Sequence, residues 1–403
     1  MGSEAMSATA TLDKASAMER IRACMAEEAE SGRLPVDRSE VPLSAEYFTR
    51  EWLTSVLCAG VGGAEVKAFE LLGEANLGTT ARRNVAVHYN AAGEAAGLPQ
   101  RIFAKATPEF DSRYICGLSG AIAHEANFYN RIAPLVSIEA PRCYHADYDP
   151  PSFRSIFLFE DAGVTKGARF LDGGFRVQRH DMEAMLRTIA GLHGRFWGDP
   201  ILDTHFTWLK DPYSYQLHIN DLIGFRERTQ LGLERSLNIL PPGLRARHGE
   251  LWDAMIKACR LRAEAPRTLL HADIHLGNWY VTDKGAMGLC DWQCTVKGGW
   301  ASDFAYAVTS SLEPAERRAW EKDLLAFYLD ALELPPGQAR PAFEDAWLDY
   351  RRQTLHGLYN WLFVAGIGEA ATLMHSGTIT TNNLRRMTVA VDELDTLDAL
   401  AEA

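Results

Sequence analysis

The chain has little of what would place it outside the cytoplasm. No apolar run in its 403 residues is long enough to span a bilayer, and the N-terminus lacks the apolar core of a secretory signal peptide. The seven cysteines are scattered and odd in number, a pattern typical of reduced thiols and not of a disulfide framework. Met6 stands where N-myristoylation requires Ser or Thr. We therefore expect a cytoplasmic protein with no membrane partner.

The sequence also lacks the basic excess of a nucleic-acid-binding protein. Its formal net charge is −12, whereas proteins that bind nucleic acid normally carry a basic face. The composition, 47% hydrophobic and 23% charged, is ordinary for a soluble globular protein, and the chain is long enough for two lobes. We expect no nucleic-acid partner, and either a monomer or a homodimer.

What the sequence does have is one stretch, from Thr268 to Ala307, with many chemically capable side chains. Three short apolar runs are separated by a polar segment and by a turn. This spacing predicts strand, loop, strand, turn and strand. Asp273 follows the first run and Asp291 follows the last. The polar segment between the first two runs also contains His271, His275 and Asn278.

These residue types suit phosphoryl transfer. The reaction needs a carboxylate to accept the proton of the attacking hydroxyl, and it needs amide and carboxylate oxygens to hold Mg²⁺ against nucleotide phosphates. Asp273, with Asn278 five residues later, has the spacing of base and metal ligand in the kinase catalytic loop. Asp291 stands where the Mg²⁺-binding aspartate of kinases should follow.

The stretch resembles the phosphotransferase branch of the protein-kinase-like fold, which includes aminoglycoside and macrolide phosphotransferases, choline kinases and ecdysteroid-kinase-like enzymes. Asp291-Trp292-Gln293 replaces Asp-Phe-Gly, and with the long C-terminal helical region it favours the ecdysteroid-kinase-like group and its bacterial relatives. Ala272 stands where the family usually has Gly.

The resemblance implies a role for each polar residue of the stretch. Asp273 would be the catalytic base, and Asn278 and Asp291 would hold Mg²⁺. His271 would brace the loop, whereas His275 would orient the loop or contact the phosphate. The phosphoryl donor would be ATP, or GTP in its place, and the acceptor a small hydroxylated molecule whose identity the sequence does not specify.

Two other functions fit part of this pattern. A metal-dependent hydrolase could use His271, Asp273 and His275 as zinc ligands, because they alternate at one strand end. That function requires further histidine ligands, but the later histidines, His356 and His375, form no ligand-like cluster. A pseudokinase that binds nucleotide without transferring phosphate is the second alternative.

A glycine-containing hairpin is predicted upstream, at Val66–Tyr89. Its connection, Gly73 to Gly78, would let backbone N–H groups approach phosphates, so we assign Gly73, Asn76 and Gly78 to cofactor binding. A plain hairpin turn explains the same residues when they are taken alone.

The next strand and helix add a charged pair. Lys105 lies in an otherwise apolar strand, Arg101 to Thr107, and Glu125 lies inside the apolar stripe of a helix near Ala121–Ile132. A lysine and a glutamate directed inward each need a partner. Kinases pair such residues, and the lysine contacts the nucleotide phosphates.

The resemblance also assigns the segment Phe157–Gly163 as the connection between the lobes. The residue pattern predicts two strands next to this segment, Pro141–Tyr148 before it and Arg154–Glu160 leading into it. The backbone from Phe159 to Ala162 would hydrogen-bond an adenine edge, so Glu160 and Ala162 join the cofactor-binding set.

The remaining segments read mainly as helices. His193, on the apolar face of a helix at Asp181–Trp197, is expected to be a hydrogen-bonded core histidine. Asp303 is expected to accept backbone N–H groups of a helix N-terminus or the catalytic-loop His271. Further helices are expected at 14–30, 44–57 with Ser44 as N-cap, 313–332, 341–374 interrupted at Gly366 and Gly368, and 383–400. Aromatic residues of the long helix would line an acceptor pocket or form core: Trp347, Tyr350, His356, Tyr359, Trp361 and Phe363.

The expected fold is α/β (α+β) and two-lobed, of the protein-kinase-like type. A small antiparallel-sheet N-lobe that binds nucleotide would span residues 44–162, after an N-terminal extension at 1–43. A larger, mostly helical C-lobe at 163–403 would carry the catalytic loop and the acceptor-binding helices.

Overall fold

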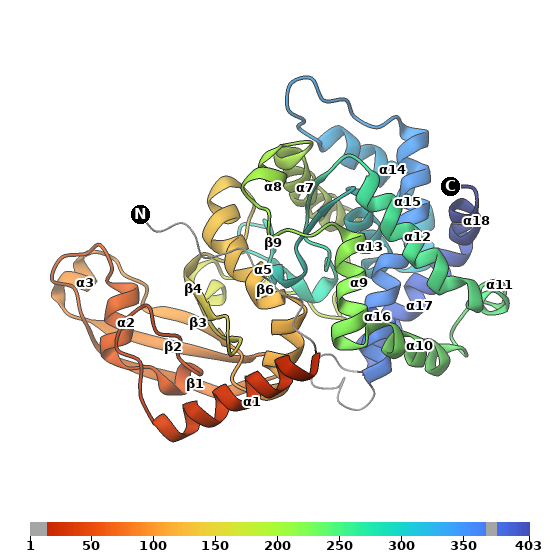
Figure 1. The fold of residues 1–403 in the computed structure, drawn as a ribbon. Helices are drawn as coiled ribbons and strands as arrows, with labels where there is room; N and C mark the ends of the chain where they lie inside the picture. Colours follow the sequence, from red (N-terminus) through yellow and green to blue (C-terminus); the bar gives the residue numbers. More distant parts are fainter. Residues whose placement is uncertain (1–13, 368–376) are drawn as a thin grey trace. The chain divides into compact units, whose positions relative to one another are not determined.

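The computed structural model describes residues 14–367 and 377–403, and for Asn76 and Leu77 the backbone alone. The chain forms two compact units. Residues up to Ile122 group with Cys143–Phe159, and Ala123–Arg142 group with Glu160–Ala403. The first unit carries a five-stranded sheet and the second is mostly helical, which confirms the predicted fold class (Figure 1).

The sheet of the first unit has the strand order β1-β2-β3-β5-β4. The pairs β1–β2, β2–β3 and β4–β5 are antiparallel. Val85, Val87 and Tyr89 alternate along β2 and are buried, as their spacing predicts. The strands are β1 (Val66–Leu77), β2 (Ala81–Tyr89), β3 (Arg101–Ala106), β4 (Cys143–Asp149) and β5 (Arg154–Glu160).

The glycine-containing connection is shorter than predicted. Strand β1 continues through Gly73 as far as Leu77, and only residues 78–80 connect it to β2. The register shifts between Leu72 and Asn76, where Gly73 has a φ of 63°. Glycine tolerates this left-handed conformation. The segment that the sequence predicted as a loop is therefore a register shift within strand β1.

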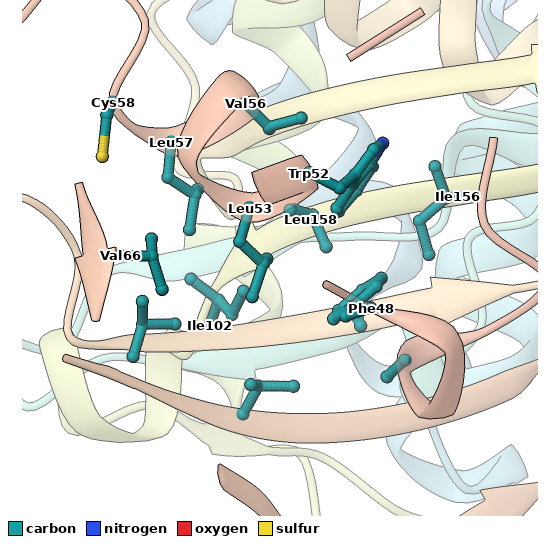
Figure 2. Close-up of a cluster of buried hydrophobic side chains, with 14 of the residues drawn as sticks. Phe48, Trp52, Leu53, Val56, Leu57, Cys58, Val66, Ile102, Ile156 and Leu158 are labelled. Carbon is teal, nitrogen blue, oxygen red and sulfur yellow. The ribbon is translucent and has the colours of Figure 1, made fainter. Parts of the chain in front are cut away.

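One helix and one face of the sheet enclose the core of this unit. Trp52 and Leu53 of α2 (Arg50–Leu57) pack on Ile102, Ile156 and Leu158 of the strands (Figure 2). Burial of apolar side chains of this kind is the main favourable contribution to folding.

The helix starts later than predicted. Thr49 is its N-cap and accepts a hydrogen bond from Trp52 N at 3.0 Å. Ser44 instead precedes a separate 3-10 turn, η1 (Ala45–Tyr47), and its hydroxyl donates to Glu46. Extended backbone at Phe48 separates the two elements, which is why Ser44 does not cap the helix.

The other helical elements of the first unit lie at its N-terminus and beside the strands. Helix α1 matches the predicted helix at 14–30 and contacts α4 and η2. These other helical elements are α1 (Lys14–Ser31), α3 (Ala91–Ala95), α4 (Phe110–Ser112), η2 (Arg113–Gly117) and α5 (Ala121–Asn127). Helix α5 continues into the second unit.

The second unit contains helices around two small sheets, with strand orders β10-β7 and β6-β8-β9. The strands are β6 (Arg169–Phe170), β7 (Thr268–Leu270), β8 (Trp279–Val281), β9 (Met287–Leu289) and β10 (Val296–Gly298). The helical elements are η3 (Phe128–Ile132), η4 (Ala133–Leu135), α6 (Ala162–Thr165), α7 (Arg179–Phe196), α8 (Ile201–Thr204), α9 (Pro212–Ile223), α10 (Phe225–Ser236), α11 (Pro242–Ala246), η5 (His248–Glu250), α12 (Leu251–Glu264), η6 (Leu276–Asn278), η7 (Trp292–Cys294), α13 (Ala301–Ser311), α14 (Pro314–Ala331), α15 (Phe343–Gln353), α16 (Leu355–Ile367), α17 (Gly377–Glu393) and α18 (Thr396–Ala401).

The long helix predicted at 341–374 is two helices, and its break is not at Gly366. The break lies at Thr354, between α15 and α16. Gly366 is inside α16, where a Cβ would lie 1.8 Å from Arg228 O of α10, so the glycine permits close helix packing. Gly368 and His375 lie outside the described residues. None of the helices within 14–367 and 377–403 has the length and apolarity needed to cross a membrane.

Candidate active site

The stretch from Thr268 to Ala307 forms the predicted strand, loop, strand, turn and strand. Strand β7 pairs with β10, and β8 pairs with β9 in a hairpin. The amide of Cys290, just after β9, donates to Asn278 O at 2.9 Å. This bond ties the loop that ends at Asn278 to the strand exit that carries Asp291.

A buried carboxylate holds the beginning of this loop. Asp303, in the first turn of α13, accepts hydrogen bonds from His271 N at 2.8 Å and Ala272 N at 3.0 Å. Burial raises the pKa of Asp303, but the hydrogen bond and charge of His193 and the contacts of His271 outweigh it, so the pKa lies below its ordinary value. Asp303 therefore stays ionised and positions the loop backbone, the role predicted for it.

His193 is the core histidine that its helix position predicts. It is fully buried. Its Nδ1 lies 2.7 Å from the Tyr328 hydroxyl, and its Nε2 lies 3.3 Å from Asp303 Oδ2. The ring thus supports the carboxylate that positions the loop.

Ala272 has an unusual backbone conformation. Its φ is 62°, in the left-handed region that glycine adopts at little cost. Asp303 binds its amide, and His356 Nε2 lies 2.7 Å from its carbonyl oxygen. Burial lowers the pKa of His356 to about 3, so the ring is neutral and Nε2 donates. The Gly that the resemblance led us to expect at this position would adopt this conformation without strain.

His271 braces the loop with both ring nitrogens. Nε2 lies 3.0 Å from Cys290 O, and Nδ1 accepts from Asp273 N at 3.2 Å. Burial lowers its pKa, although Asp303 and Asp273 oppose the shift. Because both nitrogens are occupied by backbone groups, His271 is a poor zinc ligand. The hydrolase alternative therefore lacks one of its three ligands.

The carboxylate of Asp273 is held on two sides and remains accessible. Tyr306 OH donates to Oδ1 at 3.2 Å, and Asn278 Nδ2 donates to Oδ2 at 3.2 Å. Asn278 Nδ2 also donates to the Asp273 carbonyl oxygen at 2.7 Å. The Asp273 side chain is 27% exposed. A positioned and partly exposed carboxylate can accept a proton from a bound hydroxyl.

His275 lies beside Asp273 as a neutral ring. Burial lowers its pKa to about 4. Its Nδ1 accepts from Gly277 N at 3.0 Å, so the ring proton is on Nε2, which lies 3.7 Å from Asp273 Oδ2. The ring also makes an edge contact with Trp361, at 5.3 Å between centroids. His275 can therefore donate to the base or to a phosphate oxygen, but it cannot supply a full positive charge at neutral pH.

Asn278 and Asp291 fit a Mg²⁺ site by their donor chemistry. The amide nitrogen of Asn278 is committed to Asp273, which leaves Oδ1 to face a metal. Asp291 follows β9 with a φ of 65° and is half-buried. Within the described part of the chain no cluster of three or more His, Cys, Asp or Glu residues could hold a metal. Mg²⁺ commonly takes one or two protein oxygens and completes its shell with substrate phosphates and water.

Lys105 and Glu125 are both buried, as predicted. Lys105, on β3, is 5% exposed, and Glu125, on α5, is 1% exposed. Gln293 Nε2 donates to Glu125 Oε2 at 3.3 Å, which links Glu125 to the segment that follows Asp291. Lys105 belongs to the first compact unit and Glu125 to the second, and their pairing stays a prediction.

The connecting segment is fixed by side-chain contacts of Glu160. Its carboxylate accepts from Arg142 N at 2.7 Å and from the Thr165 hydroxyl at 2.8 Å, and it pairs with Lys166 at 2.7 Å. Its amide donates to Arg142 O, so only its carbonyl oxygen is left for an adenine edge. Ala162 is buried at the start of α6. The roles of Gly73, Asn76 and Gly78 in cofactor binding also stay predictions.

Sequence reasoning gave no role to Tyr306, although it lies in the same stretch. Tyr306 is three residues after Asp303 on α13, and such residues share a helix face. Because Asp303 was already expected to contact the loop, this three-residue spacing could have predicted that Tyr306 contacts the loop as well. For His356, in α16, the sequence offered only an acceptor pocket or core role, whereas it binds the loop at Ala272 O.

The chain was compared with known proteins. No curated protein matches the chain. Among solved structures, an aminoglycoside 2'-phosphotransferase-IIIa in complex with GDP is 9% identical, with a TM-score of 0.48 and coverage of 84% of this chain and 97% of that one. An ethanolamine kinase from Plasmodium vivax is 11% identical (TM-score 0.45, coverage 80% and 82%). A choline kinase from Streptococcus pneumoniae is 16% identical (TM-score 0.41, coverage 87% and 96%).

A family model gives the stronger result. The model of the phosphotransferase enzyme family matches residues 116–343, more than half of the chain. The matched range contains the whole stretch from Thr268 to Ala307 and also Glu125, whereas Lys105 and the glycine-containing hairpin lie before it. The family recognised from the sequence is confirmed: this chain belongs to the phosphotransferase enzyme family.

Proposed function

We propose that this chain transfers the γ-phosphoryl group of ATP, or of GTP in its place, to a hydroxyl group of a small molecule. The observation that carries the proposal is the state of Asp273. Its carboxylate is oriented by Tyr306 and Asn278 and is still 27% exposed. In a family of phosphotransferases, such a carboxylate is suited to accept the proton of the attacking hydroxyl.

The loop geometry supports this assignment because each polar group has a distinct task. Asp303 and His356 hold the backbone at Ala272, so the carboxylate that follows is fixed in direction. His275, as a neutral donor, can stabilise the carboxylate or a phosphate oxygen. Preorganised groups of this kind lower the barrier because they need no reorientation during the reaction.

Mg²⁺, when bound, would neutralise charge on the nucleotide phosphates. Asn278 Oδ1 and the Asp291 carboxylate would hold it, because both present oxygen and Asn278 has its nitrogen committed to Asp273. Lys105 would contact the phosphates, and Glu125 would orient Lys105.

The chemical nature of the acceptor is limited to an alcohol by this mechanism. A carboxylate base that removes one proton activates a hydroxyl group.

An aromatic side chain lies close to the Asp273 carboxylate. Trp361 contacts His275, which lies beside Asp273. Most of the aromatic set of α15 and α16 is buried core, however: Tyr350, Tyr359, Trp361 and Phe363 are each at most 8% exposed.

The test is a nucleotide-consumption screen. Purified protein with Mg²⁺ and either ATP or GTP is incubated with a panel of hydroxylated compounds, among them aminoglycosides, macrolides, amino alcohols and sterols. The mass of each product is measured, and one acceptor should gain the mass of a phosphoryl group. Tight nucleotide binding without turnover of any acceptor across the panel would favour the pseudokinase alternative.

A further inference from the structure

A cavity lies within the first compact unit, and none of the residues assigned to the active site lines it. Its volume is about 600 Å³, a size suited to a metabolite. Its walls come from α1, from the segment around η1, and from strands β2 and β3. All of these belong to the same unit, so the cavity does not depend on how the two units are placed.

The cavity lies on the opposite face of β3 from Lys105. Ala104 and Ala106 line it, and they flank Lys105 in the sequence. Successive side chains of a strand point to opposite faces, so these alanines and Lys105 point to opposite sides. Ile102 shares the face of the two alanines, and Figure 2 shows it in the core beside Leu53.

Alanines contribute to the open space in this part of the face. Where α2 covers the sheet, Trp52 and Leu53 fill the space. Beneath α1, six alanines line the cavity together with longer side chains such as Met25, Tyr47 and Arg82. The lining alanines are Ala29, Ala45, Ala75, Ala81, Ala104 and Ala106.

A buried ion pair closes one side of the cavity. Arg113 is fully buried, and Glu28 of α1 accepts from its Nη1 at 3.0 Å and its Nη2 at 2.7 Å. Arg113 Nε donates to Thr107 O at 3.1 Å, and Arg154 adds a contact to Glu28 at 3.1 Å. Every nitrogen of Arg113 is thus satisfied. This pair anchors α1 on the segment that follows Lys105, but it has no donor left for a ligand.

Arg83 is different, because it forms an ion pair with Glu46 and yet one buried nitrogen of its guanidinium makes no hydrogen bond to the described residues. It lines the cavity from β2 with its side chain 17% exposed. Its Nε is buried, and no hydrogen-bond partner exists for that atom among the described residues. Glu46 lies nearby, but its Oε1 is 3.7 Å from Arg83 Nε, beyond hydrogen-bond distance. Guanidinium groups bind carboxylates well, through two parallel hydrogen bonds.

The other charges at the cavity restrict the ligand further. Apart from Arg83 and the Arg113–Glu28 pair, the charged residues that line it are Arg82, Glu46 and Glu109. The two carboxylates outnumber the one additional arginine, so they oppose a dianion such as a phosphate monoester, whereas a single negative charge placed at Arg83 is tolerated. The alanine walls favour an apolar body on the same molecule.

We infer that this cavity binds a small monocarboxylate with an apolar body, its carboxylate at Arg83 and its body against Ala104 and Ala106. The ligand covers the back of the strand that carries Lys105 and fixes α1 on it. This binding does not rest on the proposed function.

The test uses the full chain without nucleotide and three probes: octanoate, phenylacetate and octylammonium. Octanoate or phenylacetate should raise the melting temperature in a saturable way, since a ligand of the folded state stabilises it. Octylammonium has a chain of the same length and the opposite charge, and it should not. Arg83→Gln should weaken carboxylate binding about 10- to 100-fold, as expected for the loss of a charge-assisted hydrogen bond. Arg50→Gln, at an exposed arginine of the same unit, is the matched control and should bind normally.

A second variant fills the cavity without changing charge. Ala106→Met should abolish carboxylate binding and keep the fold, because its longer side chain enters existing space. The inference is overturned if neither carboxylate binds saturably, or if Arg83→Gln and Arg50→Gln bind equally well. If Arg83→Gln does not fold, Ala106→Met and the comparison with octylammonium decide the question. Failure of the proposed function would leave these binding results unchanged, so the two failures can be distinguished.

Discussion

The hydroxyl of Tyr306 donates a hydrogen bond to Oδ1 of Asp273 at 3.2 Å. Burial raises the pKa of Tyr306 well above its ordinary value, and the negative charge of Asp273 adds to the shift, so the hydroxyl stays protonated. A glycine makes room for the ring, because a Cβ at Gly357 would lie 2.6 Å from Tyr306 Cδ2. Tyr306 of α13, for which Gly357 of α16 leaves room, therefore fixes the orientation of the Asp273 carboxylate, the proposed base.

Tyr306→Phe should therefore slow phosphoryl transfer without unfolding the protein. The variant keeps the ring and removes one hydrogen bond to a charged group, a loss that corresponds to about a tenfold or larger fall in kcat. The bond favours the ionised carboxylate, so the acidic limb of the pH–rate profile should move to higher pH. Tyr213→Phe, whose hydroxyl bonds Arg260 instead, is the control. Identical pH profiles for wild type and Tyr306→Phe would remove Tyr306 from this role.

Asp273→Asn should leave nucleotide affinity near normal, because the base acts on the acceptor. Turnover should fall by about 10²–10⁴-fold, the usual range for loss of general-base catalysis. The measurements are kcat with a verified acceptor and nucleotide affinity by calorimetry. Turnover close to that of the wild type would show that another group is the base.

Asp291→Ala should remove the effect of Mg²⁺ on stability. In the wild type, Mg²⁺ and ATP together should raise the melting temperature by mass action on the folded state, and the Mg²⁺-dependent part should be absent in the variant. Asp283→Asn, at the exposed turn of the β8–β9 hairpin, should behave like wild type. Stabilisation by zinc, with none by Mg²⁺ and ATP, would instead support the hydrolase alternative.

Ala272→Gly should stabilise the fold. A left-handed conformation costs an L-residue about 1–2 kcal/mol, partly offset by the greater freedom of glycine in the unfolded chain. The free energy of unfolding, from urea titration, should therefore rise by up to about 1 kcal/mol. The matched control is Ala319→Gly, at an exposed position in the interior of α14, which should lose about 1 kcal/mol. A lower free energy of unfolding for both glycine variants would contradict the backbone strain assigned to Ala272.

Lys105→Ala should weaken nucleotide affinity and phosphoryl transfer, and Glu125→Gln should give a milder form of the same defect. Both side chains are buried, and each charge is costly without a partner. A double-mutant cycle on nucleotide affinity should show a coupling of about 0.5–3 kcal/mol. Additive losses would mean that the two side chains do not act together when nucleotide is bound.

The sequence by itself determined the features that depend on neighbours along the chain. The spacing from His271 to Asp291 predicted the strands, the loop and the hairpin, because alternation and turn residues act locally. The same local pattern placed Lys105 on a strand and Glu125 on the inner face of a helix, and both are buried. Family recognition rested on this stretch, and the family model confirms it.

The tertiary structure decided which groups hold the loop and where the helices break. Tyr306, Asp303 and His356 reach Asp273, His271 and Ala272 across long sequence separations. Helical periodicity continues across Thr354, so no local signal marked the break, and the sequence reading placed it at the glycines instead. The cavity beneath α1 is lined by residues from separate segments, which only packing of the folded chain brings together.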